Sequence, residues 1–305
     1  MTFLSKLSDI SDTFDSRVAF LSNVKDITIS DQADLKSESV RRISNQVSYH
    51  KLPVEPQFIG IGLYHLAYGV GRQTWFINLK KPQAEPIVKN SPDEIKQIKL
   101  NNNFCAALLT DGRIHIHSLD FSRLDIPKRP LIRSFKDKQS YYMEMDIMVQ
   151  RRAIVPSKPI DIYFPQKGSN QTGPISCFSL SQDILVFAID KTIYHYDLKG
   201  TSLNLLNEYS HELPIEQIIL QPNSGVNLIF IDSDNYGYVL SPVKNQVVPI
   251  LPGKIEGALW QTIATSGNVR SIRNRSSIFV AWSGSLLVTF AFHPKTWQGG
   301  LSYLL

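Results

Sequence analysis

A β-rich unit recurs about every forty residues along this chain. Its clearest copy runs through residues 175–180 (ISCFSL), 184–189 (ILVFAI), 192–198 (TIYHYDL) and 203–209 (LNLLNEY). These runs are rich in Val, Ile, Phe and Tyr and are separated by short turns, which predicts four consecutive strands. Similar units begin near residues 57, 95, 175, 215 and 255, at separations of 38, 80, 40 and 40. Four strands in about 40–45 residues is the period of a WD40-type β-propeller blade.

The second strand of each unit is almost continuously apolar, as ILVFAI and residues 227–232 (NLIFID) show. Such strands are covered on both faces, whereas the strands of a sandwich alternate because one face meets water. We therefore predict an all-β fold, a single β-propeller domain over residues 1–305, with a sandwich-like array as the alternative. The repeats are degenerate, because the Trp-Asp dipeptide of WD repeats is absent.

Two polar and basic stretches interrupt the period. The interval of 80 holds one blade and a long loop insertion at residues 136–171, and a short basic insertion lies at residues 268–276. We count six blades or parts of blades, of the seven that a WD40-type ring commonly has. The sequence ends before an outer strand of the last unit is evident. We therefore expect an incomplete propeller, which lacks a blade or is a fragment of a longer protein.

Composition and charge exclude several classes of protein. The chain is 43% hydrophobic, 10% aromatic and 19% charged, which suits a packed core and argues against disorder. No apolar run approaches the roughly 20 residues that cross a bilayer. The first residues place Ser and Asp where a secretory signal has an apolar core, so we expect an intracellular protein. Cys105 and Cys177 lie in apolar runs and are predicted to be buried free thiols.

No motif predicts a catalytic, cofactor or metal site. Residues 69–74 (GVGRQT) lack the third Gly and the helix of a dinucleotide loop and are read as a hairpin turn. His115 and His117 share one strand face but lack further ligands at suggestive spacing. Residues 283–285 (SGS) do not complete a nucleophile elbow. His65, His195, His211 and His293 are placed at strand edges or turns.

Clustered arginines are the candidate partner-binding residues. The net charge of +5 is mild and permits weak contact with an acidic membrane surface or an acidic protein. Nothing resembles a nucleic-acid-binding fold, so no nucleic-acid partner is expected. The candidates lie in or near the two insertions: Arg129, Arg133, Arg151, Arg152, Arg270, Arg273 and Arg275.

Four segments in order carry a family resemblance: residues 62–69 (GLYHLAYG), 109–117 (LTDGRIHIH), 207–243 and 292–300 (FHPKTWQGG). Together they resemble the second propeller of the 144-kilodalton WD-repeat subunit of intraflagellar transport complex A. Members of that family carry two propellers followed by a helical repeat region.

The resemblance implies a non-enzymatic scaffold in retrograde ciliary transport, ciliary membrane-protein delivery and cilium assembly. It implies a location in the cilium (axoneme and basal body) and the cytoplasm. The implied partners are other complex A subunits and ciliary membrane cargo adaptors. A propeller subunit of another vesicle-coat or trafficking scaffold is the alternative. A propeller enzyme or ligand binder remains a third hypothesis, and it predicts polar side chains that converge on the central channel.

Overall fold

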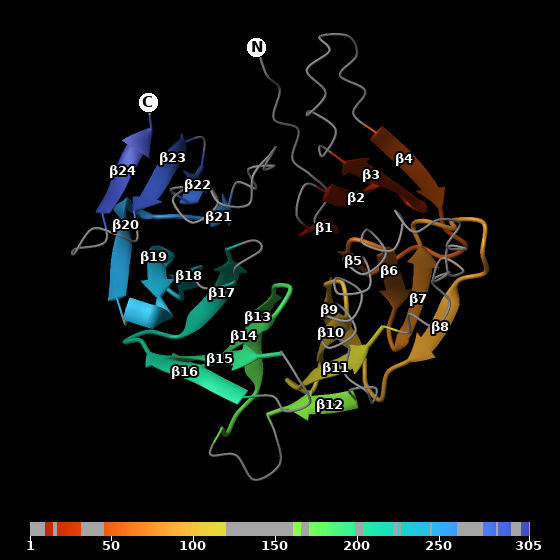
Figure 1. The fold of residues 1–305 in the computed structure, drawn as a ribbon, viewed down its shortest axis with the longest axis horizontal. Helices are drawn as coiled ribbons and strands as arrows, with labels where there is room; N and C mark the ends of the chain where they lie inside the picture. The colour runs from red at the N-terminus through yellow and green to blue at the C-terminus, as the bar shows by residue number, and fades with distance from the viewer. Residues whose placement is uncertain are drawn as a thin grey trace, which may run out of the picture.

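The computed structural model describes residues 10–14, 17–31, 46–119, 161–165, 171–198, 204–221, 225, 227–244, 246–260, 277–284, 286–293 and 300–304. These residues form six four-stranded antiparallel sheets, arranged radially as the blades of a propeller (Figure 1). Strand order within each sheet follows chain order, so the first strand of each blade lies nearest the central axis and the fourth lies at the rim. The prediction of an all-β propeller with six blades is confirmed.

The blades are numbered here in chain order. The first three comprise β1 (Ser11–Phe14), β2 (Arg17–Asn23), β3 (Asp26–Asp31) and β4 (Gln46–Lys51); β5 (Phe58–Ile61), β6 (His65–Val70), β7 (Gln73–Asn78) and β8 (Ile87–Asn90); β9 (Ile95–Leu100), β10 (Phe104–Leu109), β11 (Ile114–Ser118) and β12 (Asp161–Phe164). Blade 1 lies in a region for which sequence analysis named no strands.

The last three blades follow the predicted runs closely. They comprise β13 (Ile175–Leu180), β14 (Ile184–Ile189), β15 (Thr192–Asp197) and β16 (Asn204–Ser210); β17 (Ile215–Leu220), β18 (Leu228–Asp232), β19 (Tyr236–Ser241) and β20 (Gln246–Lys254); β21 (Gly257–Trp260), β22 (Ser277–Ser283), β23 (Leu286–His293) and β24 (Gly300–Leu304). In the described part of the chain the only helix is the short 3-10 turn η1 (Pro242–Lys244), so no described helix is long and apolar enough to span a membrane.

Two expectations about strand boundaries were wrong. Strand β12 lies inside the segment 136–171 that sequence analysis assigned to a loop, and it pairs with β11 along its length. Phe164 of β12 is fully buried between blades 3 and 4, so this part of the segment belongs to the core. The last blade does have an outer strand, because β24 pairs with β23. Residues 268–276 lie outside the described residues.

Among the described residues the core is divided into five apolar clusters, one between each pair of consecutive blades. Strand β14 shows why its sequence is continuously apolar. Leu185 and Phe187 pack towards blade 3, whereas Val186 and Ala188 pack towards blade 5, and all four are fully buried. Burying a Phe side chain contributes about 2 kcal/mol, so a second strand that is covered on both faces, such as β14, stabilises two interfaces at once.

A backbone hydrogen bond recurs between consecutive blades. An isoleucine that begins the first strand of a blade, or lies two residues before it in blade 6, donates its N–H to a carbonyl in the turn between the second and third strands of the preceding blade. The four pairs are Ile95 to Gly71, Ile175 to Gly112, Ile215 to Asp190 and Ile255 to Asn235, at 2.9, 2.8, 2.8 and 2.7 Å. All four acceptor residues have positive φ, a conformation that Gly, Asn and Asp adopt most readily. We call this contact the interblade clamp.

Blade 5 also carries a buried polar cluster that holds its turn. The Oδ1 atom of Asp232 accepts the N–H groups of Asp234 and Tyr236 at 3.0 and 2.9 Å. Its Oδ2 atom lies 3.3 Å from Nε2 of His211, whose ring packs edge-on against Tyr238. Asp232 is fully buried, and these partners offset the cost of removing its carboxyl group from water.

Candidate interaction site

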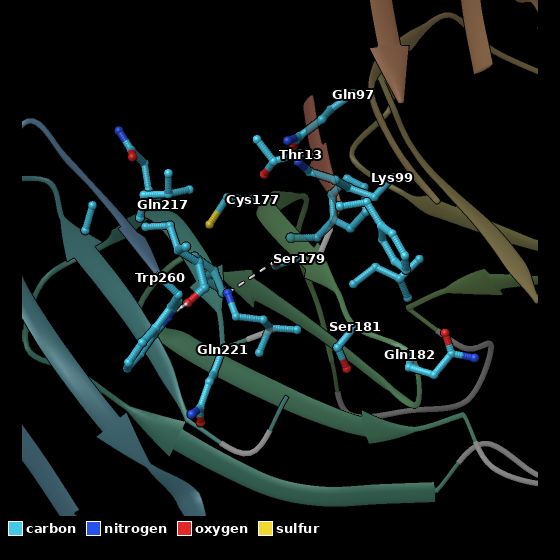
Figure 2. Close-up of a pocket in the computed structure, with 18 of the residues that line it drawn as sticks. Thr13, Gln97, Lys99, Cys177, Ser179, Ser181, Gln182, Gln217, Gln221 and Trp260 are labelled. Atoms are coloured by element: carbon cyan, nitrogen blue, oxygen red, sulfur yellow. Dashed lines mark hydrogen bonds between the residues drawn. The ribbon is translucent and has the colours of Figure 1, made fainter. Parts of the chain in front are cut away.

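The first strands of the blades surround a cavity of about 810 Å³ on the central axis. Figure 2 shows side chains that come from β1, β9, β13, β17 and β21 and point into it. The lining is rich in uncharged polar groups. Its labelled members include Thr13, Gln97, Ser179, Gln182, Gln217 and Gln221.

One of the charged side chains at the cavity is held in an ion pair. Lys99 on β9 lines the cavity, and its Nζ donates to Oδ1 of the buried Asp12 on β1. The Oδ2 atom of Asp12 accepts the N–H of Ile61 on β5 at 2.8 Å. One carboxylate therefore joins blades 1, 2 and 3. Gly60 occupies the matching position in blade 2 and has no side chain there, so Lys99 can reach Asp12 past β5.

Further hydrogen bonds between blades hold the cavity wall. Asn101 donates its amide to the carbonyls of Ser181 and Gln182 at 2.8 and 3.1 Å, which ties blade 3 to blade 4. The Oγ atom of Ser176 donates to the Ile215 carbonyl at 2.9 Å, and Nε1 of Trp260 donates to the Ile219 carbonyl at 3.0 Å. These bonds tie blades 4, 5 and 6, so the polar lining is carried by a rigid wall.

The chemistry of this lining suits hydrogen bonding better than covalent catalysis. Amide and hydroxyl groups both donate and accept, and they can therefore match the N–H and C=O groups of a bound peptide. Cys177 also contributes to the lining, but burial raises the pKa of its thiol to about 12. A thiol with such a pKa stays protonated at neutral pH, and the thiolate is the nucleophilic form.

Both cysteines are free and buried, as predicted. Burial also raises the pKa of the Cys105 thiol. The ligand-binder hypothesis predicted polar side chains around the channel, and the structure places several there. The ligand-binding part of that hypothesis is therefore retained.

The structure places the weak motifs of the sequence as follows. Residues 71–72 form the hairpin turn between β6 and β7, as expected, and Gly284 lies in the turn between β22 and β23. The ring of His115 stacks on Tyr163 at 4.4 Å, and the ring of His117 meets Phe76 edge-on at 5.8 Å. Within the described residues no group of three or more His, Cys, Asp or Glu could hold a metal ion.

The other histidines occupy different environments. His65 begins β6 and His211 directly follows β16, close to the predicted strand edges. His195 lies in the middle of β15, within the strand predicted at residues 192–198, so its placement at a strand edge was wrong. It is 2% exposed, and burial lowers its pKa to about 4. His293 is the last residue of β23.

None of the seven candidate arginines falls within the described residues. Sequence reasoning missed the polar residues that the structure does bring together, above all Asp12, Lys99 and Asn101. Their only signal was a charged or amide residue in or beside a short first strand, and their partners lie 49 to 87 residues away in the sequence. Such pairs become visible only once the blades are placed around the axis.

Comparison with known proteins agrees with this architecture. Six radial four-stranded sheets with the forty-residue period define a WD-repeat β-propeller. The sequence model of the WDR19 second beta-propeller family matches residues 18–141 and 142–303, and the chain belongs to that family.

Two curated relatives extend well beyond the matched part. The chain is 26% identical over 304 residues to mouse WD repeat-containing protein 19 and 25% identical to the human protein. Each match covers 97% of this chain and 18% of the relative, so the chain spans less than a fifth of their length.

Two solved structures share the fold. A chain in a crystal structure of the mitotic checkpoint complex aligns with a TM-score of 0.56 at 10% identity, covering 97% of this chain and 76% of its own. Hsv2 of Kluyvelomyces marxianus aligns with a TM-score of 0.54 at 14% identity, covering 94% of this chain and 80% of its own. These likenesses concern the propeller fold alone.

Proposed function

We propose that this chain is a non-enzymatic scaffold module of intraflagellar transport complex A. In this role it acts in retrograde ciliary transport, ciliary membrane-protein delivery and cilium assembly. The observation that carries the proposal is the match of the WDR19 second-propeller family to nearly the whole chain. The resemblance of four ordered sequence segments to the complex A subunit supports the same assignment.

The fold suits a scaffold. Five apolar clusters and the interblade clamps hold the blades in a rigid ring sector, which can present several surfaces at once. We propose that residues 1–305 act as one propeller domain and that its partners are other complex A subunits and ciliary membrane cargo adaptors. The proposed location is the cilium, at axoneme and basal body, and the cytoplasm.

We assign weaker roles to the two basic stretches. Arg129, Arg133, Arg151 and Arg152 in one, and Arg270, Arg273 and Arg275 in the other, are proposed to contact acidic protein or membrane surfaces. No nucleic-acid partner is proposed. Replacement of all seven by Ser tests this role: binding to vesicles containing phosphatidylserine should fall and should lose its salt dependence, whereas unchanged binding would contradict it.

The assignment itself is tested by affinity purification of the tagged chain from ciliated cells, with partners identified by mass spectrometry. We expect other complex A subunits, and we expect the fluorescently tagged chain at the basal body and axoneme. Recovery of vesicle-coat subunits in their place would support the alternative trafficking scaffold. The core variant Phe230→Ala serves as the control, because a destabilised propeller should lose specific partners.

The polar channel is the partner surface that the geometry favours. Gln97 and Gln217 come from different blades and both line the cavity, so a bound peptide segment could contact them together. The double variant Gln97→Ala/Gln217→Ala should reduce recovery of a partner that binds there. Tyr49→Ala is the matched control, because Tyr49 is exposed on the rim strand β4, away from the channel. Equal losses in both variants would contradict a role for the channel.

A further inference from the structure

An aromatic pair recurs in three blades, on the face that each turns towards the preceding blade. Its two residues pair across the second and third strands, close to the turn that joins them. In blades 2, 4 and 5 the two ring centroids lie 5.6, 5.5 and 5.0 Å apart. The pairs are Tyr68 and Trp75, Phe187 and Tyr194, and Phe230 and Tyr238. We call this the ring-pair position.

Blade 6 has two small aliphatic residues at the ring-pair position. Counted from the turn between the second and third strands, Ala281 and Val288 match Phe187 and Tyr194 of blade 4. Both belong to the apolar cluster between blades 5 and 6. A methyl group and an isopropyl group thus stand where the other blades place two rings, and they fill much less of the space between the blades.

A pocket of about 140 Å³ lies at this position, between blades 5 and 6. Ala281, Val288 and Phe290 of blade 6 line it, opposite Gly253 at the end of β20. Phe290 is 2% exposed, whereas Leu286, which also lines the pocket, is 53% exposed and stands at its opening. Apolar cavities of about 150 Å³ bind benzene, so this pocket has room for one aromatic ring.

The matching space between blades 4 and 5 is filled by the chain itself. The ring of His211 lies 5.0 Å from the ring of Phe230 and 4.8 Å from the ring of Tyr238. His211 belongs to the connection 211–214 between β16 and β17. Between blades 5 and 6 no such connection precedes the clamp residue, because Ile255 follows β20 directly. Blade 6 therefore has neither the ring pair nor the ring that covers it in blade 5.

Among the described residues that line the pocket, the only charged side chain is that of Lys254. It is exposed, and its Nζ atom lies 5.7 Å from the centroid of the Tyr236 ring. The carboxylate of Glu256 is engaged elsewhere, because its Oε1 atom accepts the Gly284 N–H at 2.9 Å. No ion pair involves Lys254 within the described part of the chain. A cation is therefore available beside the pocket for a carboxylate of a bound molecule.

We propose that this pocket binds one phenylalanine side chain from a short segment of a partner protein, with an acidic residue beside that phenylalanine. The ring takes the place that the ring pair occupies in blades 2, 4 and 5, and the carboxylate pairs with Lys254. The site is distinct from the channel, since the two cavities share no lining residue. It lies between two described blades and does not depend on the ciliary assignment, so its failure would leave that assignment standing.

The test titrates the 305-residue chain with synthetic peptides and follows the isotope-labelled methyl groups of Ala281 and Val288 by nuclear magnetic resonance. The matched peptide is acetyl-Ser-Glu-Phe-Glu-Ser-amide. One control peptide has Ala in place of Phe, and the other has Lys in place of both Glu residues. We expect the matched peptide to shift both methyl signals and to bind about tenfold more tightly than the Ala peptide. Unshifted methyl signals at millimolar peptide would overturn the proposal.

A variant with a filled pocket tests the position of the ring. Ala281→Phe/Val288→Tyr introduces the pair that blade 5 carries as Phe230 and Tyr238. Anisotropy of the fluorescein-labelled matched peptide should show binding at least about tenfold weaker than to the wild type. Tyr49→Ala is the control, because Tyr49 is an exposed aromatic residue of the distant strand β4, and it should bind like the wild type. Equal binding by the filled variant and the wild type would overturn the proposal.

The variant Lys254→Glu keeps the proposal testable even if the filled variant does not fold, because this side chain is exposed. The wild type should prefer the matched peptide to the Lys peptide by about threefold, and Lys254→Glu should reverse that preference. The same preference in both proteins would show that the peptide binds elsewhere and would overturn the proposal. Methyl shifts with toluene but with none of the peptides would identify an apolar cavity that docks no partner, which would overturn it as well.

Discussion

The contact between blades 1 and 2 and the contact between blades 4 and 5 have the same geometry but different chemistry. Between blades 4 and 5, Ile215 donates its N–H to the Asp190 carbonyl, beside an apolar cluster centred on Phe230. In blade 2 the matching first residue is Pro56, which has no N–H to donate. Here the charged side chains of Asp12 and Arg17 contact blade 2 instead.

This difference shows how neighbouring blades with degenerate sequences are held in the same arrangement. The Nη1 atom of Arg17 donates to the carbonyls of Gly62 and Leu63. Asp12 accepts the Ile61 N–H and pairs with Lys99 in blade 3. Apolar packing is common to both contacts. The polar contacts between blades 4 and 5 are an interblade clamp and the neutral side chain of Ser176, whereas charged side chains supply those between blades 1 and 2. The predictions below separate these contributions.

The largest effect is expected from the apolar cluster between blades 4 and 5. Phe230 is fully buried and stacks on Tyr238 at 5.0 Å. Phe230→Ala should lower the free energy of unfolding by about 3–5 kcal/mol, because it removes buried apolar surface and leaves a cavity. Urea unfolding measures this loss. The control Leu206→Ala, at an exposed position of β16, should change it by less than about 0.5 kcal/mol. Similar losses in both variants would contradict the packing.

The second effect concerns the contacts of the Asp12 carboxylate that link blades 1, 2 and 3. Asp12→Ala leaves the Ile61 N–H without its acceptor and Lys99 without its partner, at a cost of about 2–3 kcal/mol. Asp12→Asn retains an acceptor oxygen for Ile61 and should cost less, which chemical denaturation can compare directly. Equal stability of wild type and Asp12→Ala would mean that Asp12 does not fasten these blades.

The third effect concerns the turn residues of the interblade clamps. Gly112 has φ 81, and a Cβ there would lie 2.4 Å from Cβ of Pro174 in the next blade, so Gly112→Ala should cost about 2 kcal/mol. Gly71→Ala should cost about 1 kcal/mol, because its φ is also positive but a Cβ there meets nothing within 4 Å. Thermal and urea unfolding measure the loss of stability in each variant. The loss in Gly71→Ala reports the strain of a positive φ alone, and the additional loss in Gly112→Ala reports the steric clash. An equal cost would show that Pro174 is not close.

The smallest effect is a dependence on pH that arises in the contact between blades 4 and 5. His195 has a pKa of about 4 in the fold, lowered by burial, against an ordinary value of 6.5. The unfolded chain therefore binds more protons between these values, so this contribution to stability is complete above about pH 6.5 and is lost as the pH falls. From pH 7 to pH 5.5 the loss is about 1 kcal/mol.

The variant His195→Val isolates this contribution, since Val239 occupies the matching position of blade 5. Its unfolding free energy should fall less between pH 7 and pH 5.5 than that of the wild type. Parallel pH profiles for the two proteins would show that His195 is not the titrating group.

Much of the fold could be predicted from the sequence, because a strand that is buried on both faces has a continuous apolar pattern. Runs such as 184–189 and 228–232 are apolar on both faces, and the turns between them carry Gly, Asp or Asn where φ is positive. Blade 1 escaped recognition because its first strand is short and polar, SDTF. Strand β12 escaped because only its pairing with β11 distinguishes it from a polar segment.

The candidate site could be predicted far less well. The residues of the channel belong to blades that are distant in the sequence, and single Gln or Lys residues in short strands carry no local signal of convergence. The exposure of Leu259, Trp282 and Leu287 in blade 6 is equally invisible in the sequence, because these residues resemble those that are buried in other blades.

Local hydrophobic periodicity and turn chemistry thus specified the repeating β-blade, because each blade must bury both faces of its inner strands. The arrangement of the blades around the axis determined the contacts between residues that are distant in the sequence. It brought Asp12 to Lys99 across blade 2, gathered amide side chains at the channel, and left Trp282 and Leu287 of blade 6 exposed. These properties depend on which neighbour each surface meets, and that is set by long-range packing, not by the residues nearby in the chain.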